Sequence, residues 1–482
     1  MENDLKKPSL GTALLIVAFM FVIIILQLIA AGSPDIHLTL VFSITFAVLL
    51  LLKNGTKWSV IEDGIMHGCK IAMIPMLILM FIGMLIPTLI AAGTIPALIY
   101  YGLKIINPSV FLLTAALVCS VASLSTGSSY TTGGTFGVAF MGIGMGLGIP
   151  PAMTAGAVIS GAVIGDKLSP ISDSTNLAAG VCETNLFKHV KSMMYTTIPA
   201  FIISCILYAV LGRNYSASSI DTTAVDVILN GISSKFNVSA GYTLISIIPL
   251  AVVIFMAIKQ VSALATMVVA SLTAMIIAMV TQGFSPIEMM AFMNYGFSID
   301  VGVDAVNALL NRGGIQSMMW TVSLGFLGLS YGGILEKSRT METLLDSMKG
   351  LTKNAGNLIT THVVSTIIVN LLSASQYVSI IIPGRMYLPA YRKLGIRSDV
   401  ASRTCEDAGT VTSPLVPWGL CGVFFTGVLG VNTIEYLPYA FLSYITPVVA
   451  IIYAYTGKFI WKEEITGTAI DVKRENTADG AK

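Results

Sequence analysis

Charged side chains are scarce in this sequence. Only 11% of its 482 residues are Asp, Glu, Lys or Arg, while 55% are hydrophobic. Uninterrupted apolar runs, such as residues 10–31, are long enough to cross the roughly 30 Å of hydrocarbon in a bilayer. The composition excludes a water-soluble domain and predicts an all-α polytopic membrane protein. The formal net charge is only +2, which gives no support to a nucleic-acid partner.

Cysteine pairs and metal-binding motifs are also missing. The six cysteines lie in or beside apolar segments without CxxC spacing, so neither a disulfide framework nor a zinc site is expected. No HExxH zinc motif occurs, and the segment from Val163 to Asp166 lacks the first glycine of the GxGD motif of intramembrane aspartyl proteases. An enzyme is therefore disfavoured, and no cofactor is expected.

Hydropathy and the positions of Gly and Pro predict eight regular membrane helices. Two further stretches, 107–184 and 355–430, are apolar but interrupted by Gly, Ser, Thr and Pro. This composition is typical of re-entrant hairpins and unwound helices that lie inside protein. The predicted regular helices span 10–31, 38–52, 69–91, 193–212, 241–258, 262–282, 315–335 and 436–455.

The two interrupted stretches are related to each other. After a three-residue gap, Ser169 falls on Ser413. The chain is therefore predicted to be an internal duplication. The gap-free part of the alignment pairs identical residues: Gly148 with Gly395, Ser128 with Ser375, and Tyr130 with Tyr377.

Charge placement indicates that the second copy is inverted relative to the first. Basic residues surround Gly395, whereas its counterpart Gly148 has none nearby. Because loops rich in Lys and Arg lie on the cytoplasmic side, equivalent loops then lie on opposite sides of the membrane. The basic residues around Gly395 are Arg385, Arg392, Lys393 and Arg397.

Two inverted-topology repeats with five crossings each give about ten transmembrane crossings, two re-entrant hairpins and two broken helices, with both termini cytoplasmic. The predicted division of the chain is a first repeat at 1–212 with hairpin 107–149 and broken helix 150–184, an extracellular linker at 213–240, a second repeat at 241–456 with hairpin 355–396 and broken helix 397–430, and a cytoplasmic tail at 457–482.

The first broken helix contains an unusually polar string, from Gly165 to Asn176. Pro170 cannot donate a main-chain hydrogen bond, so nearby carbonyl groups are free to bind a ligand. Carboxylates, hydroxyls and free carbonyls are the ligands that small hard cations prefer, and charges at this depth are functional by default. The candidate binding residues of this half are Asp166, Ser169, Asp173, Ser174, Thr175 and Asn176.

The second half offers a matching set of polar residues. If its broken helix and both hairpin tips meet the first set near the middle of the membrane, they form one site, with Asp166, Asp173 and Glu406 as candidate sodium ligands. A buried carboxylate also holds a proton readily when no cation is bound, so sodium and protons would compete. The second set is Glu406, Asp407, Thr410, Thr412 and Ser413, and the tips add Ser128, Tyr130, Ser375 and Tyr377.

A structural interpretation of these residues stays open. Asp166 with Lys167, or Glu406 with Arg403, could form neutral pairs that only hold helices together. The two tip tyrosines could equally be packing residues.

The string GDKLSPISDSTNLA, from Gly165 to Ala178, resembles the hallmark segment of the NhaC family of sodium/proton antiporters. The resemblance extends to the segments Gly93 to Lys104 and Arg403 to Trp418, and it covers nearly the whole chain. One departure is Gly419, where the family pattern has a polar residue after the tryptophan.

The resemblance implies an inverted-repeat carrier in a prokaryotic cytoplasmic membrane, often a homodimer with elevator-like motion, that exchanges sodium ions for protons. Some relatives resemble exchangers of malate for lactate. The alternative prediction is therefore an organic-acid or amino-acid carrier coupled to sodium or protons. The expected partners are sodium ions, protons and the lipid bilayer, with a small organic acid or amino acid in the alternative.

Overall fold

The computed structural model describes residues 7–31, 34–215 and 222–462. Within these residues the regular structure is helical, apart from one isolated bridge between Ile396 and Lys462. Nine of the described helices are long and apolar enough to cross a membrane, or up to 11 spans exist if each of two bent helix pairs counts as one. The prediction of an all-α polytopic membrane protein is confirmed.

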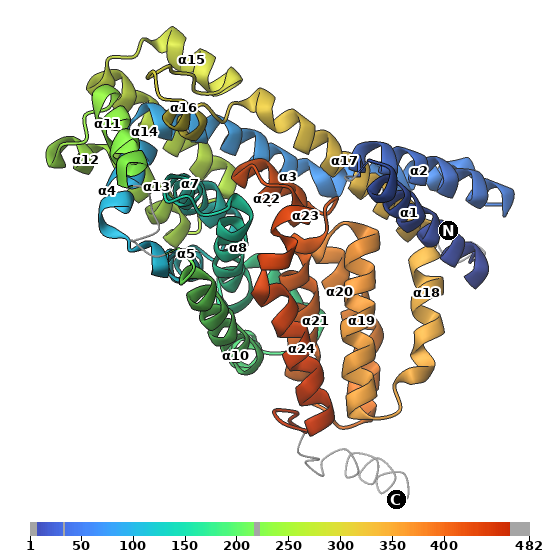
Figure 1. Cartoon of the computed structure of the whole chain (residues 1–482). Coiled ribbons are helices and arrows are strands. Elements are labelled where there is room, and N and C mark those ends of the chain that lie inside the picture. Colours follow the sequence, from blue (N-terminus) through green and yellow to red (C-terminus); the bar gives the residue numbers. More distant parts are fainter. Residues whose placement is uncertain (1–6, 32–33, 216–221, 463–482) are drawn as a thin grey trace, which may run out of the picture.

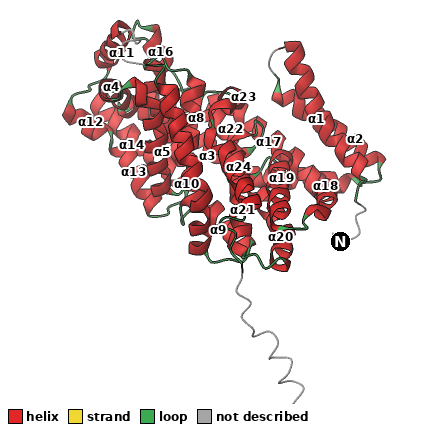
Figure 2. Cartoon of the chain, turned by 60° about the horizontal axis from the view of Figure 1, so that its bottom comes forward, coloured by secondary structure: helices red, strands yellow, loops and turns green. Residues whose placement is uncertain are grey.

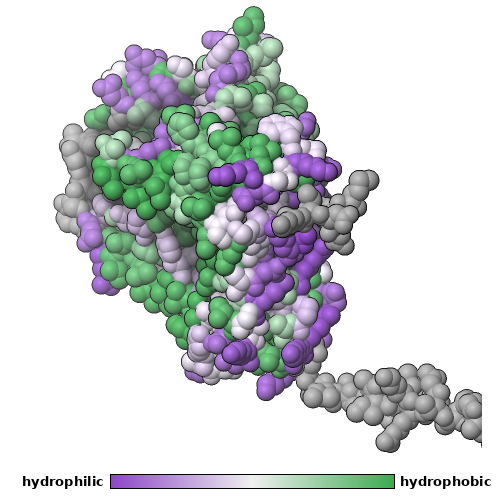
Figure 3. Space-filling view, turned by 90° about the vertical axis from the view of Figure 1, so that its right-hand side faces the viewer, coloured by the Kyte–Doolittle hydropathy of each residue, from purple (hydrophilic) through white to green (hydrophobic). Residues whose placement is uncertain are grey.

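The outer surface of the bundle is suited to lipid. Large apolar side chains such as Ile29, Ile206 and Val280 are exposed over 78%, 56% and 79% of their surface. Figure 3 shows broad hydrophobic areas on the side of the molecule, with hydrophilic residues gathered toward its top and one edge. Because lipid tails are as apolar as these side chains, their exposure is tolerated in a bilayer.

The first half of the chain folds into long helices, a hairpin and a broken helix (Figure 1). The long helices and the connecting helix are α1 (Leu10–Ala31), α2 (Ile36–Lys53), α3 (Trp58–Ala91) and α4 (Thr94–Ile105). The hairpin consists of η1 (Pro108–Val110), α5 (Phe111–Thr126), α6 (Ser129–Thr132), the π-helical turn η2 (Gly133–Gly137) and α7 (Val138–Gly146). The broken helix is α8 (Pro151–Leu168) with α9 (Asp173–Val181), followed by α10 (Leu186–Gly212) and α11 (Thr222–Lys235).

The second half repeats this order. Its long and connecting helices are α12 (Ala240–Ser246), α13 (Ile248–Ile258), α14 (Ala263–Gln282), α15 (Pro286–Tyr295), α16 (Asp304–Leu310), α17 (Ile315–Lys337), α18 (Thr340–Met348) and η3 (Lys349–Leu351). The hairpin is α19 (Ala355–Ser373) with α20 (Gln376–Lys393). The broken helix is α21 (Ser398–Thr412), η4 (Ser413–Leu415) and α22 (Leu420–Leu429), followed by α23 (Thr433–Tyr436), η5 (Leu437–Tyr439) and α24 (Phe441–Thr456).

Several helices differ from their predicted bounds: the helix predicted at 193–212 begins at Leu186, and the one predicted at 436–455 begins at Phe441. The third helix begins at Trp58 instead of residue 69, and its 34 residues make it about 51 Å long. This is longer than the hydrocarbon layer, because its first turns are amphipathic and continue into the aqueous boundary. The helix predicted at 241–258 is interrupted at Ile247, just before Pro249, whose ring nitrogen has no hydrogen to donate.

Parts of two predicted regions cannot be compared with the structure. The predicted linker 213–240 contains α11, but its residues 216–221 lie outside the described residues. The same holds for residues 463–482 of the predicted tail 457–482.

The two halves share unusual main-chain conformations at equivalent positions. Each half has three residues with a left-handed main chain at equivalent places. One precedes the connecting helix, one lies at the turn of the hairpin, and one lies at the end of the hairpin. The conformation recurs even at Arg339 and Ala374, where a side chain makes it unfavourable by about 1–2 kcal/mol. The matching pairs are Gly93 with Arg339, Gly127 with Ala374, and Gly148 with Gly395.

The centre of the structure is a close contact between α3 and α17. A Cβ atom added to Gly68 would lie 2.1 Å from the Leu329 carbonyl oxygen, and one added to Gly333 would lie 2.1 Å from the Gly64 carbonyl oxygen. Near the other end, Gly83 lies against Gly314. Contact positions rise along α3 as they fall along α17, so the two helices run antiparallel. Small residues allow this approach of two main chains.

Several other contacts recur at equivalent places in the two halves. Helix α14 packs on α3 and α2 packs on α17, while α12 packs on α4 and α1 packs on α18. These four contacts form two equivalent pairs, one member of each pair in each half of the chain.

The hairpins and broken helices pack together beside this centre. Helix α5 lies along α8, and α19 and α20 lie against α21. Helix α9 contacts both α20 and α21, and Figure 2 shows these three side by side. The tip of the first hairpin and the start of α20 are thereby brought to the break between α8 and α9.

We expect Gly68→Ala to lower the free energy of unfolding by about 1–3 kcal/mol, because the new methyl group collides with the main chain of α17. Thermal unfolding in detergent measures the change. Gly11→Ala is the matched control, since its nearest neighbour, the Ser9 hydroxyl oxygen, lies 3.9 Å from the added atom. Equal stability of the two variants would contradict the packing described for α3 and α17.

Candidate functional site

The break between α8 and α9 is centred on Pro170, as the sequence predicts. The hydroxyls of Ser174 and Thr175 donate hydrogen bonds of 2.8 and 2.7 Å to the main-chain carbonyl of Asp166. This carbonyl would otherwise be left without a partner by the break. Ser174 and Thr175, predicted as ligands, therefore hold the break in shape.

Two other predicted residues of this string also have partners within it or beside it. The Ser169 hydroxyl donates to the Leu124 carbonyl at 3.1 Å. The Asn176 amide donates to the carbonyls of Ser172 and Pro170 at 2.7 and 2.9 Å.

The buried Asp166 carboxylate binds the tip of the first hairpin. The main-chain N–H of Ser129 donates to one carboxylate oxygen at 2.7 Å, and the Ser129 hydroxyl donates to the other. Ser129 is the first residue of α6, whose N–H groups have no partner within the helix. Both donors stabilise the charged form of this carboxylate and offset part of the cost of burying it.

Asp173 joins the two halves of the chain. Its carboxylate accepts a hydrogen bond of 2.7 Å from the hydroxyl of Tyr377, at the start of α20. Tyr377 is therefore more than a packing residue.

The other predicted tip residues have mixed roles. Ser128 and Ser375 cap the second arms of their hairpins, by accepting hydrogen bonds from the N–H groups of Thr131 and Val378. Tyr130 stacks on Phe424 with ring centroids 4.1 Å apart, and it also faces the cavity described next.

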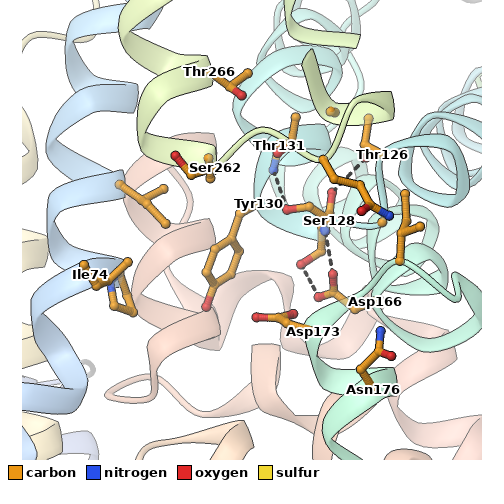
Figure 4. Close-up of a pocket in the computed structure, with 18 of the residues that line it drawn as sticks. Ile74, Thr126, Ser128, Tyr130, Thr131, Asp166, Asp173, Asn176, Ser262 and Thr266 are labelled. Carbon is orange, nitrogen blue, oxygen red and sulfur yellow. Dashed lines mark hydrogen bonds between the residues drawn. The ribbon is translucent and has the colours of Figure 1, made fainter. Parts of the chain in front are cut away.

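A cavity of about 730 Å³ lies between these elements (Figure 4). Its wall is completed by α3 and by the start of α14. It contains two carboxylates, and none of its described lining residues is Lys, Arg or His. The polar lining residues are Thr126, Ser128, Ser129, Tyr130, Thr131, Asp166, Asp173, Asn176, Gln260, Ser262, Thr266, Gln376 and Tyr377.

The basic side chains of Lys167 and Arg403 contact Asp407 and do not line the cavity. Lys167 forms a fully buried ion pair with Asp407, which also accepts a hydrogen bond of 2.7 Å from Thr196. Arg403 approaches the same carboxylate, with its Nε 3.9 Å from Oδ2. The alternative pairs expected from the sequence, Asp166 with Lys167 and Glu406 with Arg403, are therefore wrong, because Asp407 is the shared partner.

The predicted residues of the second broken helix lie outside the cavity lining. Glu406 is fully buried, and neither carboxylate oxygen has a hydrogen-bond partner among the described residues. The same is true of the Thr410 and Ser413 hydroxyls. Thr412 donates to its own helix, at the Ala408 carbonyl.

The three carboxylates expected to share a sodium ion do not form one set. Asp166 and Asp173 line the cavity and Glu406 does not, and the described residues contain no group of three His, Cys, Asp or Glu side chains that could hold a metal ion. The alignment of the halves gives the reason. Thr410 takes the place of Asp166, and Glu406 lies one helical turn earlier, where the helix is still regular.

Several lining residues were not among the predicted ligands. Ser129 and Gln376 are next to the predicted tip residues, so the polar composition of the tips pointed to them. Gln260, Ser262 and Thr266 come from the region between α13 and α14, which has no motif in the sequence. Only the folding of the chain brings them to the site.

A model of the Na+/H+ antiporter family matches residues 5–175 and 161–458 of this chain. The chain belongs to the Na+/H+ antiporter family. It is thus a multi-pass membrane antiporter, and its predicted resemblance to NhaC proteins is confirmed.

Similar proteins cover almost the whole antiporter. It is 39% identical to the Na(+)/H(+) antiporter NhaC of Alkalihalophilus pseudofirmus, over 95% of this chain and 98% of that one. It is 37% identical to the malate-2H(+)/Na(+)-lactate antiporter of Bacillus subtilis, over 95% and 97% of the two chains. It is 35% identical to the arginine/ornithine antiporter ArcD of Halobacterium salinarum, over 95% and 93%.

We expect Lys167→Met to lower the free energy of unfolding of the antiporter by about 3–5 kcal/mol, because it leaves the buried Asp407 carboxylate without its closest counter-charge. Thermal unfolding in detergent checks this. Lys191→Met, on an exposed face of α10, is the control and should stay within about 0.5 kcal/mol of the wild type. Equal effects of the two substitutions would show that the buried pair is not needed for stability.

Proposed function

We propose that this antiporter exchanges sodium ions for protons across a prokaryotic cytoplasmic membrane by alternating access. The observation that carries the proposal is the charge of the cavity, which holds Asp166 and Asp173 and no basic side chain among its described lining residues. Such a cavity attracts a cation and repels an anion. The similar NhaC protein of Alkalihalophilus pseudofirmus is named as a Na(+)/H(+) antiporter, which agrees with this proposal.

Asp166 and Asp173 are the proposed sodium ligands, with oxygen atoms of the first hairpin tip completing the set. Sodium is a hard cation and, like calcium, prefers oxygen ligands. The hydrogen bonds from Ser129 offset part of the cost of burying the charged, cation-binding form of Asp166.

Glu406 is the proposed second ionisable group. A fully buried carboxylate without donors around it is unfavourable in its charged form, so the protonated form is favoured while no cation is near. Burial disfavours the charged form of both Asp166 and Glu406, and the Ser129 donors offset part of this cost at Asp166.

The buried charges suggest how the two ions are coupled. Asp166, Asp173, Glu406 and Asp407 are four carboxylates near the two positive charges of Lys167 and Arg403. A sodium ion at Asp166 and a proton at Glu406 each add one positive charge to this region. Because like charges disfavour one another in a low-dielectric interior, binding of one ion favours release of the other.

The proposal includes two inverted repeats with both termini cytoplasmic. The antiparallel packing of the equivalent helices α3 and α17 supports inversion, since equivalent helices of parallel repeats would run the same way. Homodimer formation and elevator-like motion, implied by the resemblance, stay predictions.

A larger substrate is the second candidate. The cavity of about 730 Å³ exceeds the volume of one ion, and relatives are named for malate, lactate, arginine and ornithine. A carboxylate substrate would have to enter with protons or sodium, because the described lining has no basic side chain. Uptake of each radiolabelled solute into proteoliposomes distinguishes this candidate from exchange of sodium and protons alone.

In everted vesicles, we expect Asp166→Asn and Asp173→Asn to reduce the sodium-driven release of protons, read with a pH-sensitive dye, by at least about tenfold. Loss of a charged ligand that contributes 1.4 kcal/mol or more produces a change of this size.

Asp226→Asn, on an exposed face of α11, is the matched control and should respond like the wild type. Glu406→Gln, which imitates the protonated acid, should still exchange radiolabelled sodium but lose the pH dependence of sodium affinity. Wild-type vesicles without any sodium-driven proton movement would rule out the proposed exchange. Unchanged responses in both aspartate variants would instead rule out only the proposed ligands.

The topology has its own test. In a background without native cysteines, we expect Pro150→Cys and Lys393→Cys, both at exposed positions that end equivalent hairpins, to react with a membrane-impermeant thiol reagent from opposite sides of intact cells and everted vesicles. Labelling of both from one side would contradict the inverted arrangement.

A further inference from the structure

Two cavities beside the first hairpin join into one groove, here called the hairpin groove. One, of about 640 Å³, lies between α4, α7 and α12, and the other, of about 390 Å³, lies between α5 and α13. They share the side chains of Val118 and Phe136. Figure 1 shows these helices together at the left of the molecule.

The lining of the hairpin groove is apolar. Each of its three hydroxyl groups already donates a hydrogen bond to a main-chain carbonyl. Tyr101 donates to the Val238 carbonyl at 2.8 Å, Thr243 donates to the same carbonyl at 3.4 Å, and Ser125 donates to the Val121 carbonyl at 2.8 Å. The described lining therefore offers no free polar group to a polar ligand, and it matches hydrocarbon.

The groove is continuous with the lipid-facing surface. Leu117, Val121 and Leu244 beside it are exposed over 43%, 64% and 73% of their surface. Along α5 the lining runs from Leu117 to Ser125, which is about 12 Å of helix, close to the roughly 15 Å depth of one leaflet.

We propose that the hairpin groove binds one acyl chain of a membrane phospholipid. The chain gains van der Waals contact along the groove that it would not have with a smooth helix surface. Lys104 is exposed on the last turn of α4, next to the lining residue Ile105. Its ammonium donates to the Tyr100 hydroxyl at 2.6 Å and keeps further N–H groups for a lipid phosphate.

This places lipid and ion on opposite sides of the first hairpin tip. Ser125 lies in the hairpin groove, and the next residue, Thr126, lines the polar cavity. The acyl chain fills the space between the hairpin arm α5 and helix α13 of the second half.

Native mass spectrometry of the antiporter purified in detergent tests the proposal. We expect the wild type to retain one phospholipid, and Val118→Trp, whose indole fills the groove, to retain about tenfold less at the same collision energy. Val280→Trp, on the lipid-facing side of α14, is the matched control and should retain lipid like the wild type. Equal retention in all three proteins would mean annular lipid only and would overturn the proposal.

A second measurement does not depend on the folding of Val118→Trp. Phe136→Trp places a similar ring in the groove wall, and its fluorescence, taken as the difference from wild type, reports a nearby chain. After reconstitution with a phospholipid brominated on its acyl chains and re-extraction into detergent, we expect Phe136→Trp to remain quenched and Val280→Trp to recover. Recovery of both would likewise overturn the proposal.

Discussion

The bilayer supplies no water to unwound main chain, and this constraint organises the whole site. Wherever a helix stops inside the protein, another part of the chain must satisfy the freed groups. The break at Pro170 is satisfied by Ser174 and Thr175, and the free N–H of the hairpin tip at Ser129 is satisfied by Asp166. The hairpin and the broken helix therefore depend on each other, and neither has its observed shape alone. The cavity exists because these polar ends meet in one place.

Much of the fold follows from local sequence features. Apolar runs predict the membrane helices, and Gly, Ser, Thr and Pro mark the interrupted stretches, since these residues interrupt regular helices and leave main-chain groups free. Gly148 and Gly395, which the sequence alignment pairs, both have a left-handed main chain in the structure. The long start of α3 is harder to predict, since an amphipathic segment at a membrane boundary can lie along the surface or continue a crossing helix.

The site was only partly predictable, because the type of a residue does not determine which other residues its side chain contacts. Asp166 and Asp173 were identified from their place at a break, and both line the cavity. Lys167 is adjacent to Asp166 in sequence, yet on a helix adjacent residues point about 100° apart, so it reaches Asp407 on another helix instead. Glu406 belongs to a recognisable motif, but it lies one helical turn before Thr410, the position equivalent to Asp166. Gln260 and Ser262 reach the cavity through tertiary packing alone.

The two proposed acidic ligands come from one set of elements, and this has a consequence for energetics. Ser129, Asp166 and Asp173 all belong to the first hairpin and its broken helix, whereas the apolar wall comes from α3. A rigid displacement of the former past the latter would leave the bond lengths around a bound cation unchanged. The intrinsic affinity for the cation would then be the same whichever compartment the cavity faces.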